Sequence, residues 1–505
     1  MSTSMKTRAG RSSDRRSPRG PTALVLACLL ASGCAVGPNF APPAAPAVDR
    51  YPDQSVPARL EADGSAQTIE PGRPTAPTWW RLFGSPALDN LVAAGLKSSP
   101  TLASARQALQ ESQDQARAGA GVFFPSVGAA ASAVSERTNP VEFGQGGQGS
   151  TFSLYTLTGA VGYALDLFGG ERRQVEALNA QADYQRNAVG AAYLLLTGDI
   201  VDAAVARAGY AEQVATLADI VKLDQAQRDI LKTEYDAGTA AWSAELAAEQ
   251  QLDADEQSLS LERQRLAASV TLLQTLMGRE PAEASPEPPA LDDFAVPPDA
   301  PVSLPSQLVR ERPDILEAEA NLHQASAQVG VATAALFPSI SITGDYGAAS
   351  TSLASLASPM GRFWSVGPTI DVPIFRGGEL WYGRKAAQAA FVKAAADYRQ
   401  TVLAALEQVA DSVKALGGDA EIAAASRQAF DAAALDSKLS DANRTSGLIS
   451  DFDAMTADIA TDRARLTLVA AKSQRLQDVV ALYLASGGGW TGQDPGSGRI
   501  AVSAK

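Results

Sequence analysis

The sequence predicts a mainly α-helical, internally duplicated chain that also carries four strands of a membrane β-barrel. Three observations lead to this fold class: landmark motifs recur in one order, two long stretches have helical periodicity without proline, and short segments alternate between apolar and polar residues. The 505 residues are 46% hydrophobic but 6% aromatic, with one His, two Cys and a net charge of −14. This composition excludes zinc fingers, iron–sulfur clusters, disulfide scaffolds and a general nucleic-acid binder.

Residues 1–33 have the organisation of a bacterial lipoprotein signal peptide. A basic region comes first, the apolar run Ala23–Leu30 follows, and Ala31-Ser-Gly-Cys34 ends the segment with small residues. The run is shorter than the roughly 20 residues that a membrane-spanning helix needs. Because Ala-Ser-Gly-Cys resembles a lipobox, we expect cleavage before Cys34 and a palmitate-type lipid on it. An ordinary signal peptide with a chance cysteine is the alternative.

Beyond this segment the chain consists of two repeats joined by a connector. Phe124-Pro-Ser126 matches Phe337-Pro-Ser339, 213 positions later, and Phe168-Gly-Gly170 matches Phe375-Arg-Gly-Gly378. Landmarks that recur in one order predict a duplicated unit. The predicted organisation is a lipidated extended segment at 34–85, repeat 1 at 86–280, a Pro-rich connector at 281–305, repeat 2 at 306–490 and a flexible tail at 491–505.

Each repeat contains one very long helix, a turn and a return helix. Residues 170–236 and 377–445 contain no proline, and in the second stretch the larger apolar residues recur at near-heptad steps. At 1.5 Å per residue such a helix spans on the order of 100 Å, more than a compact domain needs. The pattern fits a long α-helical barrel, and a free-standing coiled coil is the alternative that the helices leave open.

Each repeat also contains two segments with the two-residue period of a strand. The predicted strands lie at about 126–137, 151–166, 339–348 and 362–373. Ile340, Ile342 and Tyr346, for example, share one face of their segment, and hydroxyl or acidic residues take the other. Alternating segments about ten residues long are typical of a transmembrane barrel, although a half-buried soluble sheet gives the same pattern.

Four strands cannot close into a barrel by themselves. Because lipid satisfies no open sheet edge and small barrels use about eight strands, the barrel must be shared between chains. Three chains would supply twelve strands around a wide lumen, and the same symmetry would gather the long helices into a tube. The residues alone leave two or four copies open as well.

The order of these features resembles the TolC-type outer-membrane efflux proteins, in particular their NodT/OprM-like lipoprotein branch, over residues 34–490. The motifs that carry the resemblance are the lipobox-like Cys34, Pro77-Thr-Trp-Trp-Arg-Leu-Phe83, the strand–helix corner motifs given above, and Ala485-Ser-Gly-Gly-Gly-Trp490. The resemblance implies a lipid-anchored homotrimer with a twelve-stranded barrel in the outer membrane and a helical barrel in the periplasm. It implies the passive exit duct of a tripartite efflux pump for drugs or other toxic small molecules. The partners would be a periplasmic membrane-fusion adaptor and an inner-membrane transporter of the RND type.

The sequence contains no sign of its own energy source or chemistry. No segment after residue 33 resembles a nucleotide-binding loop or a catalytic constellation, so we expect neither an enzyme nor a cofactor beyond the lipid on Cys34. One alternative is a structural or adhesive coiled-coil lipoprotein without a pore, against which the alternating strands weigh. Another is the outer-membrane duct of a protein-export system.

The turns at the ends of the long helices are the candidate contact sites for the adaptor. Glycine commonly ends helices in a left-handed conformation, and a glycine follows each very long helix here. In the family these turns meet the adaptor; ending the helix is the alternative role of the glycines. The second turn has Arg444 where the first has Tyr235 and the family usually has an aromatic residue. The expected contact residues are Gly238, Thr239, Gly447, Leu448 and Ser450.

A periplasmic gate is expected just before the second turn. Family members narrow there through apolar and acidic residues, and this chain offers Leu435, Asp436, Leu439 and Asp441. Carboxylates that point inward in a symmetric ring repel one another and favour cations. A solvated acidic helix face is the alternative interpretation.

Overall fold

The computed structural model describes residues 35–46, 57, 59–62, 64–139, 144, 148–283 and 288–490. The predicted signal peptide, the proposed lipid site Cys34 and the predicted tail lie outside these residues. The chain divides into two compact units. The first, which we call the strand unit, holds the chain up to Asn39, Ala118–Ala177 and Ser326–Ala389; the second, the helical unit, holds Phe40–Arg117, Leu178–Ala325 and the chain from Ala390 onward.

Long α-helices make up most of the described chain, which confirms the predicted mainly α-helical class. Helices α4 (Gly170–Asp236) and α8 (Glu379–Thr445) have 67 residues each. Each is followed by a 35-residue helix, α5 (Trp242–Leu276) or α9 (Asp451–Ala485), so the hairpin helices of the two repeats are equal in length. The shorter helices are α2 (Pro86–Ser98), α3 (Pro100–Gly119), α6 (Pro305–Glu311) and α7 (Pro313–Ala334).

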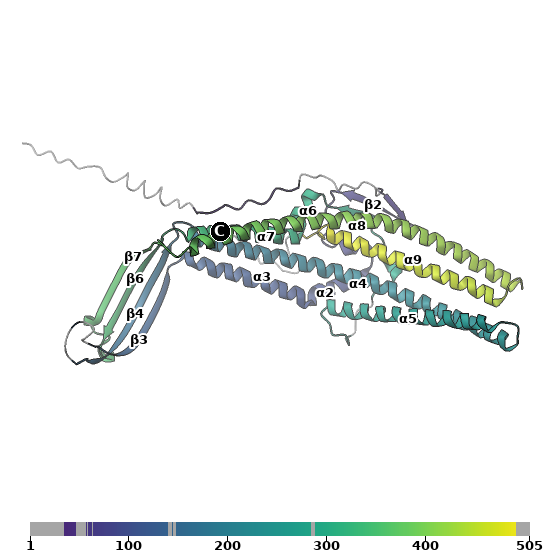
Figure 1. Ribbon diagram of the computed structural model, residues 1–505, viewed down its shortest axis with the longest axis horizontal. Coiled ribbons are helices and arrows are strands. Elements are labelled where there is room, and N and C mark those ends of the chain that lie inside the picture. Colours follow the sequence, from purple (N-terminus) through teal and green to yellow (C-terminus); the bar gives the residue numbers. More distant parts are fainter. Residues whose placement is uncertain are drawn as a thin grey trace, which may run out of the picture. The chain divides into compact units, whose positions relative to one another are not determined.

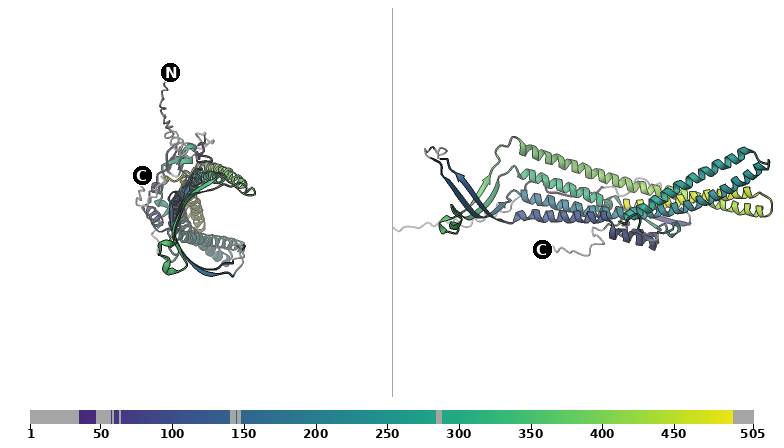
Figure 2. Two further views of the ribbon diagram at one scale, coloured as in Figure 1. Left: turned by 90° about the vertical axis from the view of Figure 1, so that its left-hand side faces the viewer. Right: turned by 90° about the horizontal axis from the view of Figure 1, so that it is seen from below.

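The strand unit contains one antiparallel sheet of four strands (Figure 1). The strands lie in the order β3 (Ser126–Arg137), β4 (Thr151–Leu165), β6 (Ser339–Ser350) and β7 (Arg362–Asp371). Strands β4 and β6 belong to different repeats and pair from Tyr155 opposite Ser350 to Leu165 opposite Ile340. The repeats are therefore joined by a continuous ladder, and β3 and β7 remain as open edges of a sheet that is curved when seen end on (Figure 2).

The ends of these strands are staggered across the sheet. Arg362, which begins β7, lies opposite Ala348, and the same row continues through Leu157 to Ala131 on β3. Strand β3 continues beyond that row to Arg137, six residues further on. A stagger of this kind is what tilted strands need in order to close into a barrel.

The helical unit contains a small sheet that the sequence pattern did not predict. Strand β1 (Arg59–Ala62) pairs antiparallel with β2 (Ser65–Pro71), and β2 pairs parallel with β5 (Asp299–Val302). The segment 34–85, expected to be extended, and the Pro-rich connector 281–305 thus meet in one sheet.

The core of the helical unit joins the Trp-Trp motif that begins at Pro77 to the glycine motif that ends at Trp490. The fully buried Trp79, in a 3-10 helix at Trp79–Phe83, stacks on Tyr483 of α9 with ring centroids 5.2 Å apart. Gly489 has a φ of +69°, and a Cβ there would lie 2.5 Å from the backbone of Ala76. The C-terminal glycine motif is therefore required by a close approach of two backbone segments as well as by its left-handed conformation.

Within the described residues, α4 contains an 18-residue stretch of mean hydropathy 1.5, long and apolar enough to cross a membrane. Of that stretch, 67% is buried inside the chain. Burial of this extent is what a core helix of a helical bundle shows, so we interpret α4 as packed against its neighbours.

Candidate functional site

The turn between α4 and α5 ends the first long helix with a left-handed glycine. Gly238 has a φ of +73°, and its N–H donates to the carbonyl of Tyr235 at 2.8 Å. The N–H of Thr239 donates to the carbonyl of Glu234, also at 2.8 Å. This pair of bonds is the Schellman ending, in which the last helical carbonyls find donors after the helix has stopped.

The turn between α8 and α9 has the same geometry. Gly447 has a φ of +71°, its N–H donates to Arg444 at 2.9 Å, and the N–H of Leu448 donates to Asn443 at 2.9 Å. The exchange of Tyr235 for Arg444 between the repeats therefore leaves the backbone geometry of the turn unchanged, because its hydrogen bonds use only the backbone carbonyl of each residue.

The side chain of Arg444 adds an ionic link across the second turn. Its guanidinium lies 2.7 Å from the carboxylate of Asp441 on α8 and 3.4 Å from that of Asp451 on α9. All three side chains are exposed, so solvent screens both ion pairs and they add little to stability.

The predicted contact residues of the turns are exposed. Leu448 is 73% exposed, and Gly238, Thr239 and Gly447 are exposed as well. Ser450 has a structural role: its Oγ accepts the N–H of Asp453 at 3.1 Å and caps the start of α9. Adaptor contact by these residues stays a prediction.

An exposed tryptophan next to the first turn was not among the contact residues selected from the sequence. Trp242 is the first residue of α5 and is 59% exposed. A large aromatic residue left in water beside a turn is typical of protein–protein contacts. The signal that could have found it is a lone Trp four residues after Gly238, in a chain with only six Trp.

The four gate candidates lie on α8 but do not share one face. Leu435 and Leu439 are 59% and 57% exposed, and Asp436 and Asp441 are exposed too. At about 100° per residue, Asp441 lies roughly 140° around the helix from Asp436. Asp441 is also paired with Arg444 at 2.7 Å, whereas Leu435, Asp436 and Leu439 fall on one arc. A gate role for the four residues stays a prediction.

A buried carboxyl cluster links the two helical hairpins. Asp224 on α4 is 3% exposed and faces Asp255 on α5, whose carboxylate accepts from Arg463 on α9 at 3.2 Å and from Gln251 at 2.7 Å. Burial first, and then the neighbouring Asp255, raise the pKa of Asp224 to about 6. Close to neutral pH this contact between the hairpins is therefore sensitive to protonation.

A second link between the hairpins is a set of neutral hydrogen bonds. The side-chain amide of Gln227 on α4 donates to the carbonyl of Phe452 at 3.1 Å and to the hydroxyl of Thr456 at 2.8 Å, both on α9. Because neither the amide nor its acceptors titrate, this link does not depend on the protonation of Asp224.

The two faces of the sheet in the strand unit differ in polarity. On the polar face, the Ser365 hydroxyl donates to the Asp345 carboxylate at 3.1 Å. The other face, which we call the apolar face, is largely exposed: Trp364 is 73% and Val366 68% exposed. Its larger members are Val127, Tyr155, Leu157, Val161, Tyr163, Leu165, Ile340, Ile342, Tyr346, Trp364, Val366 and Ile370.

Aromatic residues mark the corners where strands meet helices. At the join of the repeats Phe168 stacks on Phe337 with ring centroids 4.7 Å apart. The repeat-related residues at the two open edges, Phe375 and Phe124, are 87% and 72% exposed. The phenylalanine stack therefore forms where the two repeats join, whereas the equivalent phenylalanine at each open edge is exposed.

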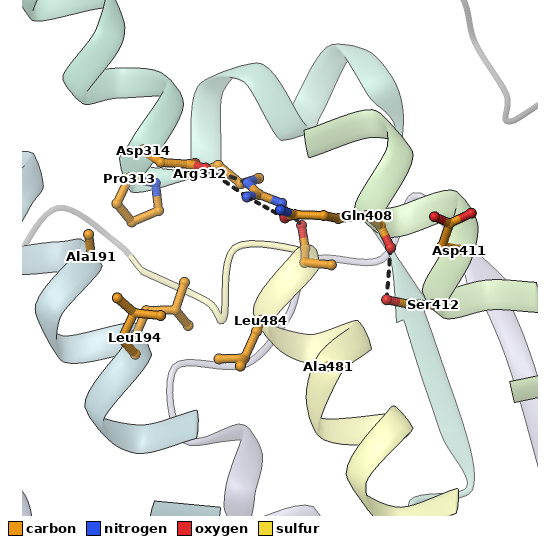
Figure 3. Close-up of a pocket in the computed structure, with 12 residues that line it drawn as sticks. Ala191, Leu194, Arg312, Pro313, Asp314, Gln408, Asp411, Ser412, Ala481 and Leu484 are labelled. Carbon is orange, nitrogen blue, oxygen red and sulfur yellow. Dashed lines mark hydrogen bonds and ion pairs between the residues drawn. The ribbon is translucent and has the colours of Figure 1, made fainter. Parts of the chain in front are cut away.

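A hollow of about 590 Å³ lies in the helical unit beside the C-terminal motif (Figure 3). Arg312, 7% exposed, lines it and donates to the Ala485 carbonyl at 2.9 Å, to Gln408 at 2.8 Å and to Asp314 at 2.7 Å. Because these bonds direct the guanidinium to its own chain, we interpret the hollow as a joint between α7, α8 and α9. Among the described residues no group of His, Cys, Asp or Glu side chains forms a metal site.

Comparison with known proteins assigns the chain to a family. Residues 91–279 and 304–488 each match the family described as "Outer membrane efflux protein", one match per repeat. The chain is 28% identical over 486 residues to Nodulation protein T of Rhizobium leguminosarum bv. viciae, covering 94% of both chains. It is 27% identical to Outer membrane protein OprJ of Pseudomonas aeruginosa over 94% of this chain and 97% of the relative. It is 29% identical to a toluene efflux pump outer membrane protein, TtgC, of Pseudomonas putida, over 93% and 96%.

Solved structures show the same fold. The outer-membrane channel OprN superposes with a TM-score of 0.77 at 27% identity over 90% of this chain and 100% of OprN. The CmeC outer membrane channel of Campylobacter jejuni gives a TM-score of 0.79 over 90% and 95%, at 19% identity. The chain therefore belongs to the outer membrane efflux protein family, as its repeated motifs indicated, and is an efflux channel of the outer membrane and not an enzyme.

Proposed function

We propose that three copies of this chain form the exit duct of a tripartite pump that expels drugs or other toxic small molecules. Four strands per chain would close as a twelve-stranded barrel in the outer membrane, with the apolar face toward lipid and the polar face toward the lumen. The names of the relatives, which include a toluene efflux pump and an antibiotic efflux pump of Pseudomonas putida, support this substrate class.

The exposed phenylalanines beside the two edge strands are the main support for a ring of copies. Phe168 and Phe337 form a stacked pair where β4 meets β6. Phe375 and Phe124 occupy the equivalent positions beside β7 and β3, the two open edges. If β7 of one copy pairs with β3 of the next, Phe375 and Phe124 form the same stack between chains, and no edge remains exposed to lipid.

Cross-linking between cysteines tests this ring. A chain carrying both Phe124→Cys and Phe375→Cys should give covalent trimers on oxidation, and no larger species. Phe168→Cys with Phe337→Cys is the matched control, because that pair lies within one chain and should give monomers only. Monomers from the first variant, or a ladder beyond three, would contradict the proposed assembly. Channels of one conductance in planar bilayers would support the duct itself.

The proposed lipid anchor agrees with the start of the described chain. The N–H of Val36 donates to the carbonyl of Phe168 at 3.0 Å, at the strand–helix corner. Cys34 precedes Val36 by two residues, which span at most about 7 Å. A palmitate-type lipid on Cys34 would thus reach the inner leaflet at the periplasmic end of the proposed barrel. Mass spectrometry of the purified N-terminus tests this, with Cys34→Ala as the unlipidated control.

The exposed turns would meet the periplasmic adaptor, and an inner-membrane transporter of the RND type would supply the energy. Gly238, Thr239, Gly447, Leu448 and Ser450 lie at or beside these turns. A duct of this kind discriminates little between small molecules, so substrate choice would rest with the transporter. A drug-susceptibility panel on a deletion strain, with and without complementation by this chain, tests the efflux role.

A further inference from the structure

Two arginines are the charged residues of the apolar face. Arg137 ends β3 and Arg362 begins β7, and by strand alternation both belong to the face of Val127 and Trp364. The acids of the four strands, Glu136, Asp345 and Asp371, lie on the polar face. Both arginines are exposed, and among the described residues neither forms an ion pair. These two positive charges lie at the two open edges of the sheet.

The internal duplication predicts how these arginines meet in a ring. Arg362 is the repeat partner of Tyr155, 207 positions earlier, by the same offset that relates Phe375 to Phe168. Arg137 is the repeat partner of Ser350, by the offset of 213 positions that relates Ser126 to Ser339. Within the chain Tyr155 and Ser350 are direct partners across the β4–β6 ladder.

A ladder between two copies that follows this template places Arg362 directly opposite Arg137 of the neighbouring copy. Directly opposed residues have Cβ atoms about 5 Å apart, and like charges in that position repel. The repulsion occurs beside lipid, where screening by water is weak. An anion between the two guanidinium groups would remove it, and arginine binds phosphate through two parallel hydrogen bonds.

The surroundings of the pair indicate the depth of a lipid headgroup. Trp364 lies two residues, about 7 Å, from Arg362, and an aromatic side chain at this position is typical of the boundary between hydrocarbon and headgroups. Ser135 and Ser153 are paired on the same face close to Arg137 and offer hydroxyl groups. In the proposed barrel this is the end away from the helices, in the outer leaflet.

We propose that each junction between copies binds a phosphate-bearing lipid of the outer leaflet through Arg362 of one copy and Arg137 of the next. The proposal rests on the ring described under Proposed function. The lipid neutralises the paired arginines and links adjacent copies, so it stabilises the trimer. Three equivalent sites per trimer follow from the symmetry.

The test uses the purified full-length protein, stripped of lipid in detergent. It is incubated with diphosphorylated lipid A, with the same lipid lacking phosphates, with phosphatidylethanolamine, or with inorganic phosphate. Native mass spectrometry counts the bound lipid, and SDS electrophoresis at rising temperature measures the dissociation of the trimer. We expect up to three lipid A molecules per trimer, bound at least tenfold more tightly than the phosphate-free form, and a higher dissociation temperature.

Four variants test whether the lipid binds at the junction. Arg137→Gln and Arg362→Gln should each weaken lipid A binding at least tenfold, and Arg263→Gln, an exposed arginine of α5 in the helical unit, should leave it unchanged. Arg362→Glu places an acid opposite Arg137 and should make the dissociation temperature high without any lipid. It serves as the readout if a glutamine variant fails to assemble.

The outcomes separate this inference from the proposed function. Equal binding by wild type and the glutamine variants, or equal stabilisation by phosphate-free lipid or by inorganic phosphate, would overturn the lipid site. A wild-type trimer that conducts ions but neither binds lipid A nor is stabilised by it would overturn the lipid site and leave the proposed duct unaffected. A wild type that forms neither trimers nor channels would instead refute the proposed function.

Discussion

Replacing Asp224 by Asn should make the protein more stable at neutral pH and reduce its sensitivity to pH. The buried carboxyl group faces Asp255, and its pKa is raised from 3.8 to about 6. The Asn amide keeps nearly the same shape, carries no charge and can donate a hydrogen bond to the Asp255 carboxylate. The bond between Asp255 and Arg463 is left in place.

The sign and size of the effect follow from the shift. Well below pH 3.8 Asp224 is protonated in the folded and unfolded chains alike, so it does not change the free energy of unfolding. Between pH 4 and 6 Asp224 ionises in the unfolded chain but stays mostly protonated in the folded chain, so the free energy of unfolding falls as pH rises. A shift of about two units corresponds to about 3 kcal/mol, reached above pH 6. Asp224→Asn should restore most of this lost free energy of unfolding at pH 7.5 and little of it at pH 4.

Thermal unfolding of the detergent-solubilised protein at pH 4 and pH 7.5 measures the difference. We expect Asp224→Asn to raise the unfolding temperature by several degrees at pH 7.5 and by far less at pH 4. Asp253→Asn, an exposed carboxylate on α5, is the control and should change neither value. An unfolding temperature at pH 7.5 that stays equal to wild type, or falls, would refute the account of Asp224 as a buried, destabilising acid.

Three further predictions concern the glycine motif, the gate and the turns. Gly489→Ala should lower the free energy of unfolding by more than about 2 kcal/mol, because its Cβ would lie 2.5 Å from the Ala76 backbone. Gly238→Ala has nothing within 4 Å of its Cβ and should lower it by only about 1 kcal/mol of backbone strain, and thermal unfolding distinguishes the two. Asp436→Ala should raise single-channel conductance, and Asp441→Ala should do so less because Arg444 already neutralises that carboxylate; equal, unchanged conductance in both would exclude them from the gate. Leu448→Asp should abolish drug resistance in cells while the purified channel keeps its conductance; resistance equal to wild type would show that this turn does not bind the adaptor.

The long helices and the strands of the four-stranded sheet could be predicted because their periodic patterns extend over ten or more residues. The three-stranded sheet could not, since β1 and β5 have four residues each and β5 contains Pro301. A two-residue period does not stand out over so short a segment. The partner of β2 also lies more than two hundred residues along the chain.

The candidate sites were only partly accessible from sequence. Glycine identified both turns, but the exchange of Tyr235 for Arg444 gave no sign that the backbone geometry would be the same. The gate residues were chosen as one short window, and a helix turns their side chains in different directions. The Asp224–Asp255 cluster depends on how two hairpins pack, because its arginine lies 208 residues from Asp255.

The duplication has a consequence for symmetry. A ring of six identical hairpins would present one turn surface six times and could bind only partners of matching symmetry. Because each chain here carries two hairpins, their turns are free to diverge, and Tyr235 with Trp242 near one turn already contrasts with Arg444 and Leu448 at the other. The proposed trimer would offer two kinds of docking surface in alternation around its rim, so a partner ring could fix its rotational register against it.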